Sequence, residues 1–534
     1  MLTFKNQIVK KILNYSVLLA VSLVMLNACT KTDVPVESEL TQQDFPKTDQ
    51  QFILAAGPVY TNFRTNFCLS YWQAQTLSTD EAIIVSRAGG WYDGGRYQQM
   101  HYHSWTPDNP IISDTWSWGF GTISTCNQVL SLFAASQTSP VKAQVVAEVR
   151  MMRAMMLFFM MDLYGNIPVS TTFGDTAKPT QQTREQVFNF IGSEVKAVLP
   201  ALSRATDITI YGRPNVYTAY ALLAKLYLNA EVYTGKPRYD DAVTACDTII
   251  QSGKFSLADD YAKMFYPDNG PQMKEFIFAI PYDHASAQGE QFSWYCLHPA
   301  LQTKYGLSYR LSNPESTLPS YYAQFDDPND VRTALWLTGK QYDFGGNPII
   351  IHTTKLGLDN SYTGSDGSTP VDYQLEFTPD LTLKDVAKFE AGGDELGKAK
   401  GFRNIKYYPD VTATDRNQSN DVPVFRYADI LLIKAESILR GAASTYGEST
   451  LSLVNTLRSK RKAAVLSTVD LPAMLKERAL ELNWENWRRN DLIRFGKFED
   501  SWGYKTDADI NKRLFPIPSG ERILNPALVQ NKGY

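Results

Sequence analysis

The clearest pattern of hydrophobic and polar positions lies in residues 424–440, near the C-terminal end of the chain. Apolar residues recur there at intervals of three and four, which is the spacing of one helix face. Ile430 and Ile433 widen this apolar surface, so we expect the helix to pack on more than one side. Pro423 is tolerated in a first helical turn and Gly441 is typical of the position after a helix, so both favour these boundaries.

The same repeat predicts a series of helices in the N-terminal half. Each begins at a residue whose side chain can accept a hydrogen bond from the free amides of the first turn: Thr48, Ser113, Ser139 and Thr183. Glutamine stands three residues after both threonines, which completes a predicted capping box. The predicted helices cover about 49–66, 113–134, 139–164 and 183–199.

Residues 216–252 have the pattern of a helical hairpin. Helical spacing runs over 216–230 and 239–251, and the turn between them contains Gly235 and Pro237. Small residues on both segments would let the two helices approach closely. The hairpin resembles a tetratricopeptide unit, so we expect neighbouring helix pairs to stack and share a core.

Helical periodicity fades over residues 254–420. Short strand-like runs appear at 275–281 and 349–354, and Pro, Gly, Asn and Asp lie between them. Residues 357–370 are polar and rich in turn-forming residues, which predicts a loop. This region is too long for a bare connection, so we interpret it as an irregular binding lobe on a helical scaffold.

Composition and charge narrow the functional classes. The chain has 534 residues, 44% of them hydrophobic and 20% charged, which is ordinary globular composition. Its net charge is −4, and removal of residues 1–28, with three lysines and no acid, would make it −7. An acidic chain gives no support to nucleic-acid binding, so we expect no nucleic-acid partner.

The N-terminus has the features of a signal peptide over residues 1–28. Three lysines precede a run of about ten apolar residues, which is too short to span a bilayer. Residues 26–29, Leu-Asn-Ala-Cys, resemble a bacterial lipobox, in which Cys29 becomes lipid-modified. Several acyl chains on Cys29 would anchor the protein durably, and residues 29–43 would form a flexible polar tether.

Motifs for catalysis or cofactors do not occur in the chain. No cysteine spacing indicates a metal site, and we expect the cysteines after Cys29 to be mostly buried free thiols. His101 and His103 would share one face of a strand, but the chain has only 5 histidines and no suitably spaced third ligand. We therefore expect no metal, no cofactor and no enzymatic activity.

Three glutamates four residues apart, Glu477, Glu481 and Glu485, would lie on one helix face. A glycoside hydrolase needs two carboxylates that face each other across the substrate rather than a row on one helix. We therefore interpret these glutamates as part of a structural charge network. The arginines at hand to pair with them are Arg478, Arg488, Arg489 and Arg494.

Aromatic side chains supply the candidate chemistry. Trp91 and Tyr92 stand between two glycine pairs, which helix packing explains poorly, and Asp80 and Arg87 lie near them in the sequence. Exposed rings stack on the apolar faces of sugars, and polar groups hold the hydroxyls. If half of a ring's ~150–250 Å² is covered, it contributes at most ~2–3 kcal/mol. Three rings then give an affinity of roughly micromolar to millimolar.

An ordered set of motifs resembles the SusD/RagB family of outer-membrane nutrient-binding lipoproteins. One motif, Leu-Tyr-Gly-Asn-Ile-Pro, occupies residues 163–168, and the others lie close to the C-terminus. Those motifs cover residues 402–407, 424–440, 453–458, 476–482, 491–494, 515–518 and 530–534.

The resemblance implies a mainly α fold of tetratricopeptide-like helices with an irregular loop-rich lobe. We expect one SusD-like domain over 44–534, with a helical scaffold at 44–253 and 421–534 and the binding lobe at 254–420. The protein would lie on the outer face of the outer membrane, held by its lipid anchor. It would act there as a lid on a SusC-like TonB-dependent transporter.

In the family the ligand site uses aromatic residues from the early loop and the middle region. The middle candidates in this sequence are Trp294, Tyr295, Tyr309 and Trp336. The expected ligand is an oligosaccharide or polysaccharide, captured without catalysis and delivered to the transporter. The alternatives are a peptide-binding lid of the same fold, a surface glycan-active enzyme and a plain helical scaffold.

Overall fold

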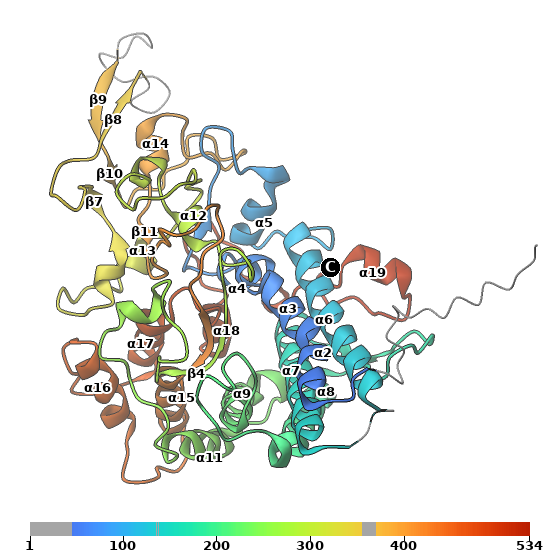
Figure 1. Ribbon diagram of the computed structural model, residues 1–534. Coiled ribbons are helices and arrows are strands. Elements are labelled where there is room, and N and C mark those ends of the chain that lie inside the picture. Colours follow the sequence, from blue (N-terminus) through green and yellow to red (C-terminus); the bar gives the residue numbers. More distant parts are fainter. Residues whose placement is uncertain (1–44, 135, 137, 355–369) are drawn as a thin grey trace, which may run out of the picture. The chain divides into compact units, whose positions relative to one another are not determined.

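The computed structural model describes residues 45–134, 136, 138–354 and 370–534 (Figure 1). The chain divides into two compact units, Met1–Pro46 and Lys47–Tyr534. The predicted signal peptide, Cys29 and the tether up to residue 43 lie outside the described residues, as does almost all of the predicted loop at 357–370. Across the described ranges, none of the helices combines the length and apolar composition needed to span a bilayer.

Most of the first helices of the second unit form as predicted, but the predicted helix over 49–66 is split in two at Ala56 and another helix starts earlier. Thr48 and Thr183 make both hydrogen bonds of a capping box, and Ser139 caps the long helix that follows it. The third helix begins at Pro110 rather than after Ser113, because the Asn109 side chain accepts a hydrogen bond from the Ile111 amide. The helices are α2 (Asp49–Ala55), α3 (Gly57–Asn66), α6 (Pro110–Ala134), α7 (Pro140–Tyr164) and α8 (Arg184–Val198).

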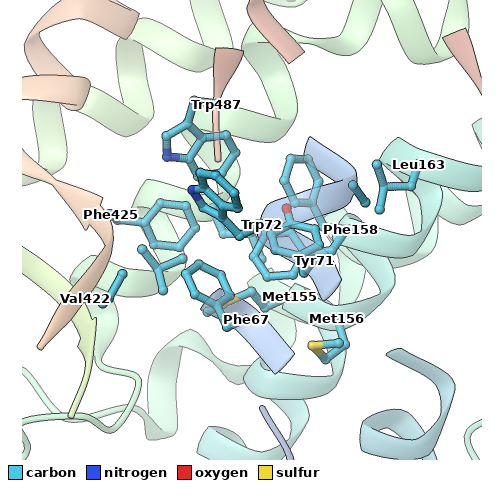
Figure 2. Packing of buried hydrophobic residues seen from close by; sticks show 14 of the residues in the cluster. Phe67, Tyr71, Trp72, Met155, Met156, Phe158, Leu163, Val422, Phe425 and Trp487 are labelled. Carbon is cyan, nitrogen blue, oxygen red and sulfur yellow. The ribbon is translucent and has the colours of Figure 1, made fainter. Parts of the chain in front are cut away.

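Helix α7 is the centre of the main hydrophobic core. Its methionines and phenylalanines are buried, since α6 and α8 pack against it. Figure 2 shows Met155, Met156 and Phe158 of α7 close to Phe67, Tyr71 and Trp72. The packing against α6 is close: a Cβ atom at Gly119 would lie 2.1 Å from Sδ of Met160. Asn127 of α6, which the sequence places near a buried face, accepts a hydrogen bond from Arg153 of α7 at 2.7 Å.

A second group of packed helices combines the hairpin near residue 230 with helices of the C-terminal region. The predicted hairpin is present, and its second helix also packs against the helix of the 424–440 segment. The helices are α9 (Val216–Leu228), α10 (Ala230–Thr234), α11 (Tyr239–Ile250), α15 (Tyr427–Leu439), α16 (Thr450–Lys460), α17 (Leu471–Leu482) and α18 (Arg488–Arg494). The last helix, α19 (Ser519–Leu524), lies apart from them on the side of α6 (Figure 1), and its Ser519 amide donates to the carbonyl of Pro107.

The predicted start of the 424–440 helix is wrong. Residues Val422–Arg426 form strand β12, which pairs antiparallel with β4 (Phe276–Ile280), and α15 begins only at Tyr427. Both strands are fully buried, so their apolar residues suit a buried strand as well as a helix. Pairing with a strand about 145 residues earlier, which no local pattern reveals, decided between the two.

Glu477, Glu481 and Glu485 do form a buried charge network, but with partners other than the predicted ones. They do not share one helix face, because α17 ends at Leu482 and Glu485 lies in the turn after it. Glu481 pairs with Arg332, Arg426 and Arg461 at 2.8–3.1 Å. The guanidiniums predicted to pair with these glutamates have other acceptors, as Arg488 has in Asp80 and Arg494 in Glu436. Long-range packing rather than sequence proximity therefore selected the pairs.

The region 254–420 contains short two-stranded sheets and single-turn helices. β8 (Ile350–Thr353) and β9 (Val371–Gln374) pair at the top left of Figure 1. Within the region, β6 (Trp336–Leu337) also pairs with β11 (Arg403–Asn404) and β7 (Gly339–Lys340) with β10 (Glu376–Phe377), while β5 (Glu315–Ser316) pairs with β1 (Ile83–Ile84) of the early loop. Outside the region, β2 (Ile167–Pro168) pairs with β3 (Gln181–Gln182). The short helices are α12 (Phe292–Cys296), α13 (Pro319–Tyr322) and α14 (Glu395–Ala399). A separate hydrophobic cluster around Leu297, Leu375 and Phe377 supports this region.

Two smaller predictions concern cysteine and histidine. Cys68, Cys126, Cys246 and Cys296 are buried free thiols, as predicted. His101 and His103 do not lie on a strand, because α5 (Arg96–Tyr102) ends there and His103 adopts a left-handed conformation. In the described part of the chain, no three His, Cys, Asp or Glu side chains converge in a metal-binding arrangement.

Candidate ligand-binding site

The early loop that carries Trp91 is a tight turn held by the lobe. Trp91 has a φ of +69° and Gly89 a φ of +76°, so the backbone turns through the left-handed region on both sides of Gly90. The Glu390 carboxylate accepts hydrogen bonds from the amides of Ala88 and Gly89 at 3.0 and 2.9 Å. These contacts fix the direction in which the indole of Trp91 leaves the chain.

Glu390 is suited to this anchoring role. Its carboxylate also accepts a hydrogen bond from the Ser86 hydroxyl at 2.7 Å. Burial alone would raise the pKa of Glu390, but the hydrogen bonds from Ser86 and the backbone amides outweigh it and lower the pKa. The anchor is therefore ionised at neutral pH.

Three aromatic rings meet where the early loop contacts α12. The centroid of Trp91 lies 5.4 Å from those of Trp294 and Tyr295, and Trp294 and Tyr295 are 4.9 Å apart and nearly perpendicular. Nε1 of Trp91 donates a hydrogen bond to Oγ of Ser312 at 3.0 Å. Edge-to-face contacts of this kind hold rings in fixed orientations.

Trp91 and Trp294 line a cavity of about 750 Å³. Both indoles are only partly buried, so each still offers surface to a ligand. Polar and charged groups also contribute to the lining, together with the apolar side chains of Ile350 and Ile351 from β8. The polar and charged lining residues are Arg87, His298, Arg310, Ser312, Asn313, Glu395 and Lys398.

The side chains that line this cavity carry more positive than negative charge. Glu395 contributes a carboxylate, which Lys398 neutralises at 3.0 Å. Burial and then the neighbouring Arg403 lower the pKa of His298 to about 3, so this imidazole is neutral at physiological pH. The guanidiniums of Arg87 and Arg310 remain, and they give the cavity a positive balance.

Comparison with known proteins identifies the family. Residues 252–534 match the SusD family, and residues 62–228 match a family described as starch-binding and associating with the outer membrane. The chain belongs to the SusD family. It is 24% identical over 510 residues to the starch-binding protein SusD of Bacteroides thetaiotaomicron, covering 88% of this chain and 86% of that protein. It is 23% identical over 559 residues to a SusD-like protein of Formosa agariphila, covering 98% and 100%.

Solved structures of SusD-like proteins share the fold. Surface glycan-binding protein A from Bacteroides thetaiotaomicron superposes with a TM-score of 0.70 at 20% identity, covering 91% of this chain and 99% of that one. The same protein in complex with laminarihexaose gives a TM-score of 0.69 at 20% identity, covering 91% and 100%. The predicted fold class, mainly α with tetratricopeptide-like helices, is confirmed.

Within this SusD-like fold, four of the predicted site residues meet at one place. Trp91 and Trp294 line the cavity, Tyr295 packs against both rings, and Arg87 lies in the wall. The guanidinium of Arg87 donates to the backbone carbonyls of Gly397 and Lys400 at 2.7 and 2.9 Å, so much of its bonding capacity holds α14 in place.

The other predicted residues lie apart from this cavity. Tyr92 is 38% exposed but is not in the cavity lining. Asp80 forms a two-pronged ion pair with Arg488 at 2.6 and 2.7 Å and borders a different pocket. Tyr309 accepts a hydrogen bond from Gln418 and is 9% exposed, and Trp336 is 6% exposed because Phe325 and Trp484 cover it.

Sequence reasoning missed several residues at this site. Arg310, Ser312 and Lys398 line the cavity, and the guanidinium of Arg416 lies 5.0 Å from the centroid of Trp294. Arg310 and Ser312 share one irregular segment, Arg416 lies in another and Lys398 lies on α14, and none belongs to a repeat or a motif. Only the path of the lobe places them beside the rings of the early loop.

Proposed function

We propose that this protein binds an oligosaccharide or polysaccharide at the cell surface and delivers it to a SusC-like TonB-dependent transporter. The observation that carries the proposal is the cluster of Trp91, Trp294 and Tyr295 at a cavity of about 750 Å³. Partly exposed indoles beside hydrogen-bonding groups suit the apolar faces and the hydroxyls of sugars. The family, with its starch-binding and glycan-binding relatives, supports the same ligand class.

The site favours binding over hydrolysis. Glu395 supplies the one carboxylate among the described residues that line the cavity, and it is paired with Lys398. Hydrolysis of a glycosidic bond needs two carboxyl groups roughly 5–10 Å apart on either side of the bond. Capture without chemistry is the role that this arrangement supports.

The proposed location is the outer face of the outer membrane, with Cys29 as the lipid anchor. The lipobox-like sequence at residues 26–29 and the description of the matched family as associating with the outer membrane support this location. Stable anchoring needs more than one acyl chain, which a lipidated N-terminal cysteine supplies. The tether after Cys29 would leave the second unit free to move over the transporter.

The affinity follows from the exposed ring surface. Because both indoles are already partly buried, a ligand covers about 40–80 Å² of each, which contributes ~1–2 kcal/mol per ring. Trp294→Ala should therefore weaken binding by roughly 5–30-fold. Calorimetric titration of the full-length chain in detergent, against a panel of polysaccharides and peptides, measures this change.

The matched control is Tyr446→Ala, which removes a ring that is 67% exposed and does not line the cavity. Saccharide binding that Trp294→Ala weakens and Tyr446→Ala preserves would support the proposal. If the unsubstituted protein, Trp294→Ala and Tyr446→Ala bind the saccharide with equal affinity, the saccharide binds outside this cavity. Binding of peptides alone would replace the glycan with the peptide alternative.

A further inference from the structure

Positive charge collects around the candidate cavity although the whole chain has a net charge of −4. Three cationic side chains line the cavity, Arg87, Arg310 and Lys398, and one carboxylate, Glu395. Because Lys398 and Glu395 neutralise each other, the two guanidiniums remain as surplus charge. A neutral sugar needs neither of them, since aromatic rings and uncharged hydrogen-bonding groups suffice to hold it.

Arg310 is the more accessible of the two. Its side chain is exposed at the cavity, and no carboxylate of the described residues lies within ion-pairing distance of it. The second exposed guanidinium beside the rings, that of Arg416, likewise has no ion-pair partner there and lies against Trp294. Most buried or half-buried arginines of this fold have carboxylate partners, as Arg426 and Arg494 do.

Two buried guanidiniums in and behind the cavity wall also lack a carboxylate partner among the described residues. Arg87 is 7% exposed, its hydrogen-bond acceptors are carbonyls and the hydroxyl of Ser316, and its Nε has no acceptor among the described residues. Burial lowers the pKa of Arg87 to about 9, so the side chain is still charged at neutral pH. Arg403, fully buried behind it, is bonded to Asn313 and to backbone carbonyls and also lacks a carboxylate.

His298 contributes one more donor. Its Nδ1 accepts a hydrogen bond from the Ala300 amide at 3.2 Å, so the neutral imidazole carries its proton on Nε2. This Nε2 is buried and has no partner in the described part of the chain. Arg87 and Arg403 therefore place positive charge behind the cavity, and its potential favours a negatively charged ligand.

We propose that the ligand is an acidic saccharide, whose carboxylate or sulfate group pairs with Arg310 while its sugar rings contact Trp91 and Trp294. This inference rests on the proposed function and names its ligand class. A guanidinium binds a carboxylate or a sulfate with two parallel hydrogen bonds, and such charge-assisted bonds are stronger than bonds to hydroxyls. Arg87 and Arg403 add a favourable potential from behind the site.

The experiment compares saccharides that differ only in charge. The full-length chain in detergent is titrated with uronate-containing polysaccharides and their methyl esters, and with sulfated galactans and their desulfated forms. At least one acidic form should bind about tenfold or more tightly than its neutral partner. Raising salt from 0.1 to 1 M shortens the screening length from about 10 to about 3 Å and should remove much of that difference.

Variants of Arg310 locate the charge. Arg310→Gln should weaken binding of the acidic form about tenfold and leave the neutral form unchanged, and Arg310→Lys should restore part of the loss. The matched control is Arg204→Gln, because Arg204 is also exposed, has no ion pair among the described residues and lies outside this cavity. An unchanged melting temperature in each variant shows that the fold is intact.

The outcomes separate the inference from the function on which it rests. Equal affinity for the acidic and neutral forms, lost in Trp294→Ala, would overturn the acidic ligand and keep the glycan site. A preference for acidic forms that Arg310→Gln leaves unchanged would also overturn the inference, since another part of the protein would then bind the acidic group. Failure of every saccharide to bind would contradict both proposals. A preference for uronates or for sulfates alone decides between the two sources of charge.

Discussion

Replacing Arg426 by methionine tests the buried charge network most directly. Arg426 is 1% exposed, and its guanidinium donates to Glu275 at 2.6 Å, to Glu481 at 2.9 Å and to both oxygens of Glu485 at 2.7 Å. Within the described residues the linked ion pairs form a closed set of five carboxylates and five cations. Its members are Glu275, Asp330, Glu477, Glu481, Glu485, Arg332, Lys406, Arg426, Arg458 and Arg461.

Arg426→Met removes one positive charge and leaves one buried negative charge without compensation. Glu275 and Glu481 keep Arg461, at 2.7 and 2.8 Å, and Glu485 keeps Lys406 at 2.5 Å, so the loss is partial. Removing one partner of a buried ion pair typically costs about 3–5 kcal/mol. We expect a loss of this size in the free energy of unfolding, although methionine fills a similar volume.

Urea denaturation, followed by tryptophan fluorescence, gives the measurement. Adding Glu485→Gln to Arg426→Met removes the surplus negative charge and should recover about 1–3 kcal/mol. A loss below about 1 kcal/mol for Arg426→Met would refute the reasoning, as would a double variant less stable than the sum of the single changes. The control is Arg204→Gln, which removes an exposed arginine and should change stability by less than about 0.5 kcal/mol.

Three other predictions concern pH, the backbone and the anchor. Burial raises the pKa of Glu290 to about 8, despite a hydrogen bond from the Phe292 amide. The neutral carboxyl therefore favours the folded state below about pH 4.5, and this contribution to stability is lost as the pH rises through 8. Glu290→Gln should flatten the fall in melting temperature between pH 5 and 8, and an unchanged slope would contradict the assignment. Gly165→Ala should lower the free energy of unfolding by more than about 2 kcal/mol in urea denaturation, because Gly165 has a φ of +73° and a Cβ there would lie 2.7 Å from Cδ1 of Leu514. An unchanged free energy of unfolding would refute this packing. Cys29→Ala should release the protein from outer membranes of cells that lack the transporter, and continued fractionation with them would refute the lipid anchor.

The sequence alone was sufficient for most of the helical scaffold. Helical spacing and capping residues are local, so Thr48, Ser139 and Thr183 marked helix starts that the structure reproduces. The ordered C-terminal motifs were enough to indicate the SusD family, which the match over residues 252–534 shows. The strand at 422–426 could not be predicted, because its hydrogen bonds depend on β4, far away in the chain.

The candidate site shows the same division. Glycine pairs beside Trp91 indicated a ring placed by a turn, and the structure has that turn. Trp294 and Trp336 have no local feature that separates them, yet the first lines the cavity and the second is 6% exposed in the core. The path of the irregular lobe decides which ring stays accessible.

Local chemistry therefore determined the elements and the kinds of residue available for binding, since helix periodicity, capping and turn propensity act over a few residues. Tertiary structure alone decided the partners. It paired Glu481 with Arg332, Arg426 and Arg461 rather than with arginines near it in sequence. It also brought Arg310 beside Trp91 and Trp294, because burial and charge pairing depend on segments that meet only when the whole chain has folded.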